Sequence, residues 1–286
     1  PVQTLEASGV VKSVSVKSVK VLKAGEFGTI SIAATKDSEQ GLYEGMSIET
    51  SGTSKAPLTI KVTGAVVEAV GSTTGVGQPV KLLSVASKVY KNEAGLKKTS
   101  LGGVGALPKV VADAAGKTLP ATATGPSSIR GSMLKVVTVS GGPLVANELV
   151  GDIDKVTVSG GNLRCGLIQS GKNLVLLQAT SKKVNGVEVG GAIGTAGKPG
   201  SMFVKAQPPV TGKSKVAITK VYGQTGVSGF FYAGFNAATC DPTKSGGIGT
   251  LQTKTGKVEG AAFLDPALVS KLKILPKDQP IAINPE

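Results

Sequence analysis

The feature of this sequence that most constrains its fold is a six-residue segment that occurs twice without change. Val-Thr-Val-Ser-Gly-Gly fills positions 137–142 and again 156–161, so that the second copy follows the first by 19 residues (156 − 137). The flanking apolar positions also match, with Leu134 and Leu144 around the first copy and Ile153 and Leu163 around the second. The shared template, apolar-x-x-Val-x-Val-x-Gly-Gly-x-Leu, describes a short alternating strand, a glycine corner and the start of another strand.

Weaker copies extend this pattern along the chain. They keep its apolar spacing and lie at Val11-x-x-Val14-x-Val16, Val184-x-x-Val187-x-Val189, Ile218-x-x-Val221 and Ile248-x-x-Leu251. One such unit cannot bury its apolar face alone, whereas stacked units form a continuous narrow core. We therefore predict an all-β fold, a parallel β-helix (β-solenoid) with coils of roughly 19 residues and loop excursions. The alternative is a set of β-sandwich domains, which also contain many short strands.

The composition suits a thin interior and excludes several kinds of chemistry. Gly accounts for 40 of the 286 residues, aromatic residues make up only 3%, and Trp is absent. The absence of His excludes Ser-His-Asp catalysis and His-ligated zinc, and the two cysteines cannot form a Cys₄ metal site. No run of ~18 apolar residues occurs, so we expect no membrane-spanning helix. We also expect no cofactor and no bound metal.

A long stretch rich in Gly, Ala and Pro divides the chain into three segments. Residues 1–95 form an N-terminal β-rich segment and a candidate strand-exchange region, residues 96–132 a loop or linker, and residues 133–286 a β-solenoid with a C-terminal cap. Within that cap, Asp265-Pro266 has the residues of a helix N-cap and first turn. The sequence leaves open whether the first and third segments share one core.

The start of the chain and its cysteines both bear on the cellular compartment. The chain begins Pro1-Val2-Gln3 without an initiator Met. A mature chain cleaved from a signal peptide begins in this way, as does a chain trimmed at its start. We expect a secreted protein, located outside the cell or at the cell surface. Cys165 and Cys240 are then candidates for one disulfide, and the alternative is two unrelated thiols.

The net charge of +14 comes almost entirely from lysine, because Arg130 and Arg164 are the only arginines. Proteins that read nucleic acids rely on arginine for bidentate contacts with phosphate and guanine, so nucleic acid is not an expected partner. Lysines spread singly along strands protect sheet edges and keep a surface soluble. They leave an anionic polysaccharide or the cell envelope as candidate partners.

Two units of the repeat resemble the glycine-rich repeats of secreted bacterial parallel β-helix surface and matrix proteins. These units are residues 153–163 and the segment from Ile248-Gly249-Thr250-Leu251 to Val258-Glu259-Gly260. The resemblance covers residues 130–265 and, more loosely, residues 1–90. This class includes adhesin passengers, surface-layer components and fibre subunits. The resemblance implies a structural or adhesive role and no catalytic residue.

We therefore expect an extracellular structural protein rather than an enzyme, whose copies assemble into a fibre, sheath or surface layer. Strand addition or coil stacking would join the copies, because the open end of a β-coil carries unpaired backbone groups. The segment 10–22 contains neither Gly nor Pro, and its candidate subunit-interface residues are Val11, Val14, Val16, Val19 and Val21. The alternative for this segment is the first coil of its own domain.

Two other functions are alternatives to assembly. A monomeric carbohydrate-binding adhesin or fibre-tip module would use Phe230, Tyr232 and Phe235 as glycan or partner contacts, because exposed aromatic residues anchor interfaces. A polysaccharide-degrading β-helix enzyme needs paired carboxylates, and the best local pair is Asp152 and Asp154. The neighbouring repeats place no acids at the matching positions, and Lys155 adjoins the pair. A solvated charge cluster is therefore the favoured interpretation of these two acids.

Overall fold

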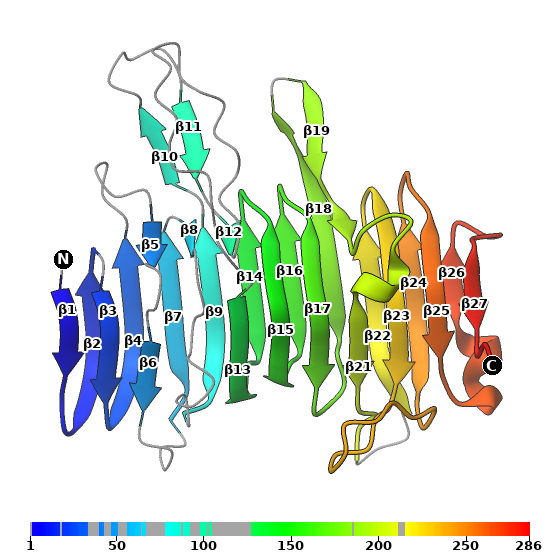
Figure 1. Cartoon of the computed structure of the whole chain (residues 1–286), viewed down its shortest axis with the longest axis horizontal. Coiled ribbons are helices and arrows are strands. Elements are labelled where there is room, and N and C mark those ends of the chain that lie inside the picture. The colour runs from blue at the N-terminus through cyan, green and yellow to red at the C-terminus, as the bar shows by residue number, and fades with distance from the viewer. Residues whose placement is uncertain are drawn as a thin grey trace.

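The computed structural model lays its strands side by side along one long axis, with β1 at one end and β27 at the other (Figure 1). It describes residues 2–17, 19–33, 40–42, 47–50, 56–63, 65–66, 78–86, 88–91, 98–101, 103–104, 127–184, 186–210 and 215–286. These residues form two 11-stranded sheets, a three-stranded sheet and a two-stranded hairpin. The chain passes from one sheet to the other and back, so that each coil adds a strand to both faces of a solenoid.

The first large sheet, called sheet 1 here, contains the strands that carry the repeat template. In order along the sheet, they are β2 (Val10–Val16), β4 (Glu26–Ala33), β7 (Leu58–Thr63), β9 (Val80–Ala86), β14 (Val136–Ser140), β16 (Lys155–Ser159), β18 (Leu176–Val184), β22 (Val216–Gly223), β24 (Gly247–Thr253) and β26 (Lys273–Leu275). Each neighbouring pair on this path is parallel. Parallel pairing of successive coils defines a β-solenoid.

The second large sheet, sheet 2, is made from the segments between those strands. It comprises β5 (Gln40–Leu42), β8 (Ala65–Val66), β12 (Gly103–Val104), β13 (Ser127–Met133), β15 (Leu144–Asp152), β17 (Leu163–Ser170), β20 (Ala192–Ile193), β21 (Phe203–Ala206), β23 (Gly226–Ala233), β25 (Val258–Phe263) and β27 (Ile281–Ile283). At the N-terminal end, β1 (Val2–Glu6), β3 (Val19–Ala24) and β6 (Ser47–Thr50) form the parallel three-stranded sheet.

Within the described ranges, two hairpins and two short helices interrupt the coils. The hairpins pair β10 (Lys88–Lys91) with β11 (Lys98–Leu101), and β18 with β19 (Val187–Gly190); both are antiparallel and project from the same side of the stack (Figure 1). The 3₁₀ helices are η1 (Pro199–Ser201) and η2 (Pro266–Lys271). Helix η2 begins as predicted, because the Asp265 carboxylate accepts a hydrogen bond from the Ala267 N–H at 2.9 Å.

Apolar side chains between the sheets line up in columns along the axis. The central column of sheet 1 pairs from coil to coil through Val14, Ile30, Ile60, Leu83, Val137, Val156, Leu177, Val221, Leu251 and Ile274. The eight members between Val14 and Ile274 are at most 1% exposed. Stacking of like side chains therefore builds one narrow core, as the template predicts.

The glycine pairs of the repeat form the corners of the coils. Gly141 and Gly160 have φ angles of 77° and 71°, a left-handed backbone that glycine adopts without steric penalty. Gly161 meets a different requirement, because a Cβ atom there would collide with the backbone carbonyl of Gly142 in the neighbouring coil. The first glycine of each pair thus turns the chain, and at Gly161 the second allows close approach between coils.

Two buried polar side chains bind the backbone of another coil near the points where the chain enters sheet 1. The fully buried Ser170 hydroxyl accepts a hydrogen bond from the Ile153 N–H and donates one to the Ile153 carbonyl, both at 2.9 Å. The Gln78 side chain binds both backbone groups of Phe27. Its Oε1 accepts a hydrogen bond from the Phe27 N–H at 3.0 Å, and its Nε2 donates one to the Phe27 carbonyl at 2.6 Å. These side chains satisfy backbone groups where the strands end.

The prediction of a parallel β-helix is confirmed, and the β-sandwich alternative is wrong because sandwich sheets are antiparallel. Pairing of Val137 with Val156 and of Leu144 with Leu163 reproduces the 19-residue repeat. Most other coils are longer because loops are inserted between their strands, as between the paired residues Val221 and Leu251, whereas the first coil is shorter, with 16 residues (30 − 14) from Val14 to Ile30.

The first and third predicted segments share one core. Strand β9 of residues 1–95 pairs with β14 of residues 133–286, and a single hydrophobic cluster contains buried residues from both segments. Of residues 96–132, the structure describes 98–101, 103–104 and 127–132, which contribute to β11, β12 and β13. The rest of that predicted loop lies outside the described residues.

Candidate functional site: the two ends of the solenoid

The end coils differ from all others in how their apolar side chains are buried. Among the described residues, the hydrophobic side chains that pack against the core and yet stay partly exposed are Leu5, Ala7, Val11, Val16, Leu272, Ile274, Ile281 and Ile283. The first four belong to the coil of β1 and β2, and the last four to the coil of β26 and β27. Each end coil has a neighbour on one side only, so its apolar face stays partly accessible to water.

The N-terminal end presents a long strand without Gly or Pro. Strand β2 is the terminal strand of sheet 1, and its only partner there is β4. Val14 is 6% exposed, Val11 and Val16 are half-buried, and Val10 at the start of the strand is 65% exposed. Three of the five predicted interface residues therefore lie on the inner face of the end strand.

The other two predicted interface residues lie in β3, on the opposite face of the coil. Val19 pairs with Val2 of β1, and Val21 pairs with Thr4 of β1 and Ser47 of β6. Both backbones are therefore engaged within the chain, and β1 rather than β3 is the terminal strand of that sheet. The predicted segment thus forms the first coil of its own domain, and its role as a subunit interface stays a prediction.

The C-terminal end has shorter strands, and amide side chains there form hydrogen bonds with the backbone of the preceding coil. Strands β26 and β27 have three residues each. The Asn284 amide accepts from the Leu264 N–H at 2.9 Å and donates to the Leu264 carbonyl at 3.0 Å, while Gln279 accepts from the Val258 N–H at 2.8 Å. Helix η2 packs beside β24, and the coil beyond it is formed by β26 and β27.

Aromatic residues gather on the outer face of sheet 2, across three neighbouring coils. The Tyr232 and Phe263 rings stack with centroids 4.4 Å apart and planes 5° apart. Phe230 makes edge-to-face contacts with Phe203 at 5.5 Å and with Phe263 at 6.4 Å. We call Phe203, Phe230, Tyr232 and Phe263 the aromatic cluster. Sequence reasoning missed Phe203 and Phe263, because only the strand register brings them beside Phe230 and Tyr232.

The environment of the aromatic cluster limits what it can bind. Partial burial raises the pKa of Tyr232, and the Lys244 ammonium lies 5.8 Å from the centroid of Phe263. Because Tyr232 and Phe263 stack on each other, each ring has one face already covered. Phe235, the third predicted contact, is only 7% exposed, so its assignment as a surface contact is wrong. It lies just beyond the end of β23, where the chain leaves the sheet.

The two cysteines are free thiols on opposite sides of sheet 2, so the candidate disulfide is absent. Cys165 points inward and is 2% exposed, and its Sγ lies 3.0 Å from the Leu167 carbonyl. Cys240 is exposed in the loop after β23, where the outward-facing Gln169 amide lies 3.6 Å from its Sγ. Burial raises the pKa of the Cys165 thiol to about 12, so it remains neutral at physiological pH.

The acidic pair lies at the end of β15 and in the corner that follows. The Asp154 carboxylate forms an ion pair with the Lys172 Nζ at 2.9 Å and a longer one with the Lys135 Nζ at 3.9 Å. Asp152 lies against Gly171 of the neighbouring coil. Two lysines therefore neutralise Asp154, as in the charge cluster expected from the sequence.

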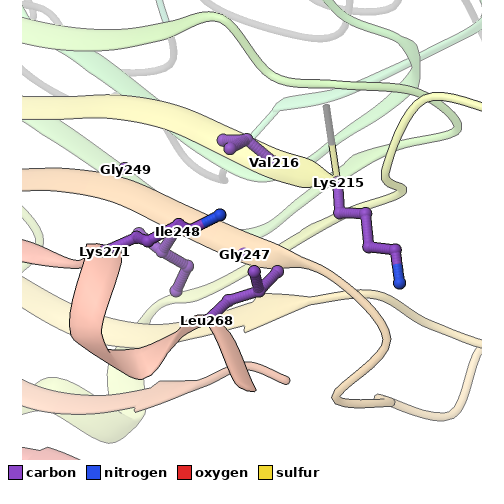
Figure 2. Close-up of a pocket in the computed structure, with 7 residues that line it drawn as sticks. All are labelled: Lys215, Val216, Gly247, Ile248, Gly249, Leu268 and Lys271. Atoms are coloured by element: carbon purple, nitrogen blue, oxygen red, sulfur yellow. The ribbon is translucent and has the colours of Figure 1, made fainter. Parts of the chain in front are cut away.

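A shallow cavity of about 380 Å³ lies between η2 and sheet 1 (Figure 2). Val216, Ile248 and Leu268 give it an apolar floor, and Lys215 and Lys271 extend from either side of it. The side chains that line it include no carboxylate, thiol or hydroxyl. The two lysines are therefore the only side chains with ionisable groups among those that line the cavity.

The described part of the chain contains neither a cluster of metal ligands nor a helix that could span a membrane. No group of three or more Cys, Asp or Glu side chains is arranged there to hold a metal ion. No helix among the described residues has the length and apolar character needed to cross a bilayer.

Comparison of the chain with protein-family models, with curated proteins and with solved structures found no match.

Proposed function

We propose that this protein is an extracellular structural protein that assembles with copies of itself through the two end coils of its solenoid. The product would be a fibre, a sheath or a surface layer. The observation that carries the proposal is the set of eight partly exposed core residues, all of which lie in the first or last described coil. Covering them with another coil would remove apolar surface from water, which is the main favourable term in association.

The backbone of the end strands supports the same proposal. Strands β2 and β26 each have one partner within sheet 1, and β1 and β27 each have one in their own sheets. Terminal strands present N–H and C=O groups that can pair with a strand from another chain. An end coil can thus offer hydrogen bonds and apolar contacts together.

The first experiment combines negative-stain electron microscopy with light scattering over a range of protein concentrations. We expect ordered fibres, tubes or sheets and a mass that rises with concentration. The double substitution Val11→Asp and Val16→Asp should abolish assembly, because it would bury two carboxylates at the interface. Val10→Asp with Ser15→Asp adds the same charge at exposed positions of the same strand and should leave assembly intact.

Circular dichroism of each variant separates loss of assembly from loss of folding. Monodisperse monomers of the unsubstituted protein at every concentration would contradict the proposal. Assembly of the Val11→Asp, Val16→Asp variant at the unsubstituted rate would contradict the role of the N-terminal coil.

A second candidate function is glycan binding by the aromatic cluster, favoured by its partly exposed rings and by Lys244 beside them. An anionic polysaccharide suits this chemistry, because the lysine can pair with a carboxylate while a sugar packs against a ring. Tyr232→Ala should then abolish binding on a glycan array, whereas Tyr222→Ala on sheet 1 should have no effect. Binding that survives Tyr232→Ala would count against this candidate. The enzyme alternative has no further support, because Asp154 is neutralised by two lysines.

A further inference from the structure

We infer that copies of the chain stack head to tail, with β26 of one copy beside β2 of the next, and with Ile274 opposite Val14. This inference rests on the proposed assembly and adds its partner, polarity and register. The partner is a second copy of this chain. A contact between two different ends does not close on itself and generates an open filament.

The central column of sheet 1 is the reason for this register. Val14 is its first member and Ile274 its last, and the chain already stacks these positions nine times between successive coils. Adding Val14 of a second copy after Ile274 extends the same column by one step. The joint between copies would then repeat the coil–coil contact that builds the subunit.

The flanking residues fit the same placement. Leu272 precedes Ile274 by two positions, as Leu58 precedes Ile60, and in the joint it would approach Val11 on the inner face. On the opposite face of the coil, Ile281 and Ile283 at one end and Leu5 at the other supply the partly exposed apolar residues. Both faces of each end coil thus bring apolar side chains to the joint.

Strand direction favours head-to-tail stacking over a two-fold arrangement of like ends. Every pairing between coils in sheet 1 is parallel, and a copy displaced along the axis keeps all strands parallel. Two N-terminal ends related by a two-fold axis would instead pair antiparallel, which the stacked coils of this chain never do in sheet 1.

In this register an outward-facing lysine of β26 lies opposite a neutral residue of β2. Ser13 pairs with Thr29, and Lys273 pairs with Thr250, so both occupy the same outer column of sheet 1. Head-to-tail stacking places Lys273 opposite Ser13. A shift by one residue would place the inward-facing side chains of β2 opposite outward-facing side chains of β26, so the register is strongly specified.

Engineered cysteines test this register directly. Ser13→Cys and Lys273→Cys are combined with Cys240→Ser, which leaves the buried Cys165 as the only native thiol. In-register parallel strands lie about 4.8 Å apart, within the range that a disulfide can bridge. Thr138→Cys with Thr157→Cys is the matched control, because these residues pair in neighbouring coils with hydroxyl oxygens 3.2 Å apart.

Oxidation of the double variant should give a ladder of covalent dimers, trimers and longer chains on a non-reducing gel. Either single variant should stay monomeric, whereas a mixture of the two should give covalent dimers and nothing longer. The Thr138→Cys, Thr157→Cys control should form its disulfide within one chain and give no ladder.

Light scattering of the same samples shows whether the protein assembles at all, independently of the head-to-tail register. Filaments that give no covalent ladder would overturn the head-to-tail register while leaving assembly in place. Covalent dimers from Ser13→Cys alone would show that N-terminal ends meet, and would also overturn it. A protein that forms no assemblies under any of these conditions would overturn both the register and the proposed function.

Discussion

The middle coils and the two end coils are built on the same column of side chains but differ in how completely it is buried. Val156 and Leu177 in the middle are fully buried, whereas Ile274 at the C-terminal end is half-buried. The residue types are alike, so the difference comes from the number of neighbouring coils. Burial in a solenoid is a property of the stack rather than of the individual coil.

The two end coils also differ from each other. The N-terminal coil has a seven-residue strand in sheet 1, comparable to the internal strands, whereas β26 at the C-terminal end has three residues followed by Pro276. Asn284 links the last coil to the preceding one, because its side chain forms hydrogen bonds with both backbone groups of Leu264. A joint between the two ends would therefore be less extensive than an internal coil contact, and we expect assembly to depend on concentration.

The largest effect expected from the comparison of middle and end is on folding stability. Leu177→Ala should lower the free energy of unfolding by about 2–5 kcal/mol, because it leaves a cavity in a fully buried column. Ile274→Ala in the same column should lower it by roughly 1 kcal/mol in the monomer. Urea denaturation at low protein concentration measures both. Equal losses would contradict the view that the end coil is incompletely buried.

Glycine substitutions should show the same contrast with a smaller effect. Gly161→Ala should destabilise the fold by about 1–3 kcal/mol, because the new methyl group would overlap the backbone of Gly142 in the neighbouring coil. Gly9→Ala in the N-terminal coil meets no atom within 4 Å and should change stability by less than about 0.5 kcal/mol. Thermal unfolding of the two variants measures the difference. Similar melting temperatures would mean that the coils are not in close contact at the Gly-Gly corners.

A hydroxyl at a coil corner offers a further comparison, between the interior and the surface. Ser170→Ala should cost about 1–3 kcal/mol of folding free energy, because it leaves the buried backbone groups of Ile153 without partners. Ser159→Ala removes an exposed hydroxyl from a middle coil and should change stability by less than about 0.5 kcal/mol. Chemical denaturation of both variants provides the test. A Ser170→Ala protein as stable as the unsubstituted one would show that the corner hydrogen bonds add nothing.

The smallest expected effect concerns the reactivity of the two thiols. A thiol reagent at neutral pH should modify Cys240 rapidly and Cys165 only after unfolding, because burial raises the pKa of the Cys165 thiol to about 12. The Cys240→Ser protein should then show no rapid reaction. Fast modification of both cysteines in the folded protein would mean that the middle of sheet 2 opens readily.

The same raised pKa gives the direction of a pH effect. Because the folded state holds the proton of Cys165 more tightly than the unfolded state, its contribution to stability is complete below pH 9. That contribution is lost as the pH rises from about 9 towards 12, the interval between the ordinary and the raised pKa.

The sequence predicted the fold where the template is clear and missed some strands of sheet 1 that share its spacing. Val80-x-x-Leu83-x-Val85 has that spacing and is buried in β9, but it lacks the Gly-Gly pair that marks the two exact copies. The segments of sheet 2 were harder to predict, because their strands vary in length and are separated by loops. Apolar spacing alone was an incomplete guide to sheet 1, because the predicted copy at Val184-x-x-Val187-x-Val189 is an antiparallel hairpin with exposed valines.

The candidate sites show what a linear pattern can and cannot provide. The inward face of β2 followed from the spacing of Val11, Val14 and Val16. The aromatic cluster did not, because Phe203 and Phe263 join it through strand register across inserted loops. The exposed character of the C-terminal coil was equally invisible, since Ile274, Ile281 and Ile283 resemble any buried strand residues until the stack ends beside them.

Electron cryomicroscopy of the assembled protein tests the central claim most directly. We expect filaments in which one solenoid continues from copy to copy, with β26 of each copy parallel to β2 of the next and Ile274 beside Val14. Assemblies held together only by side-to-side contacts, with both end coils left in solvent, would contradict it.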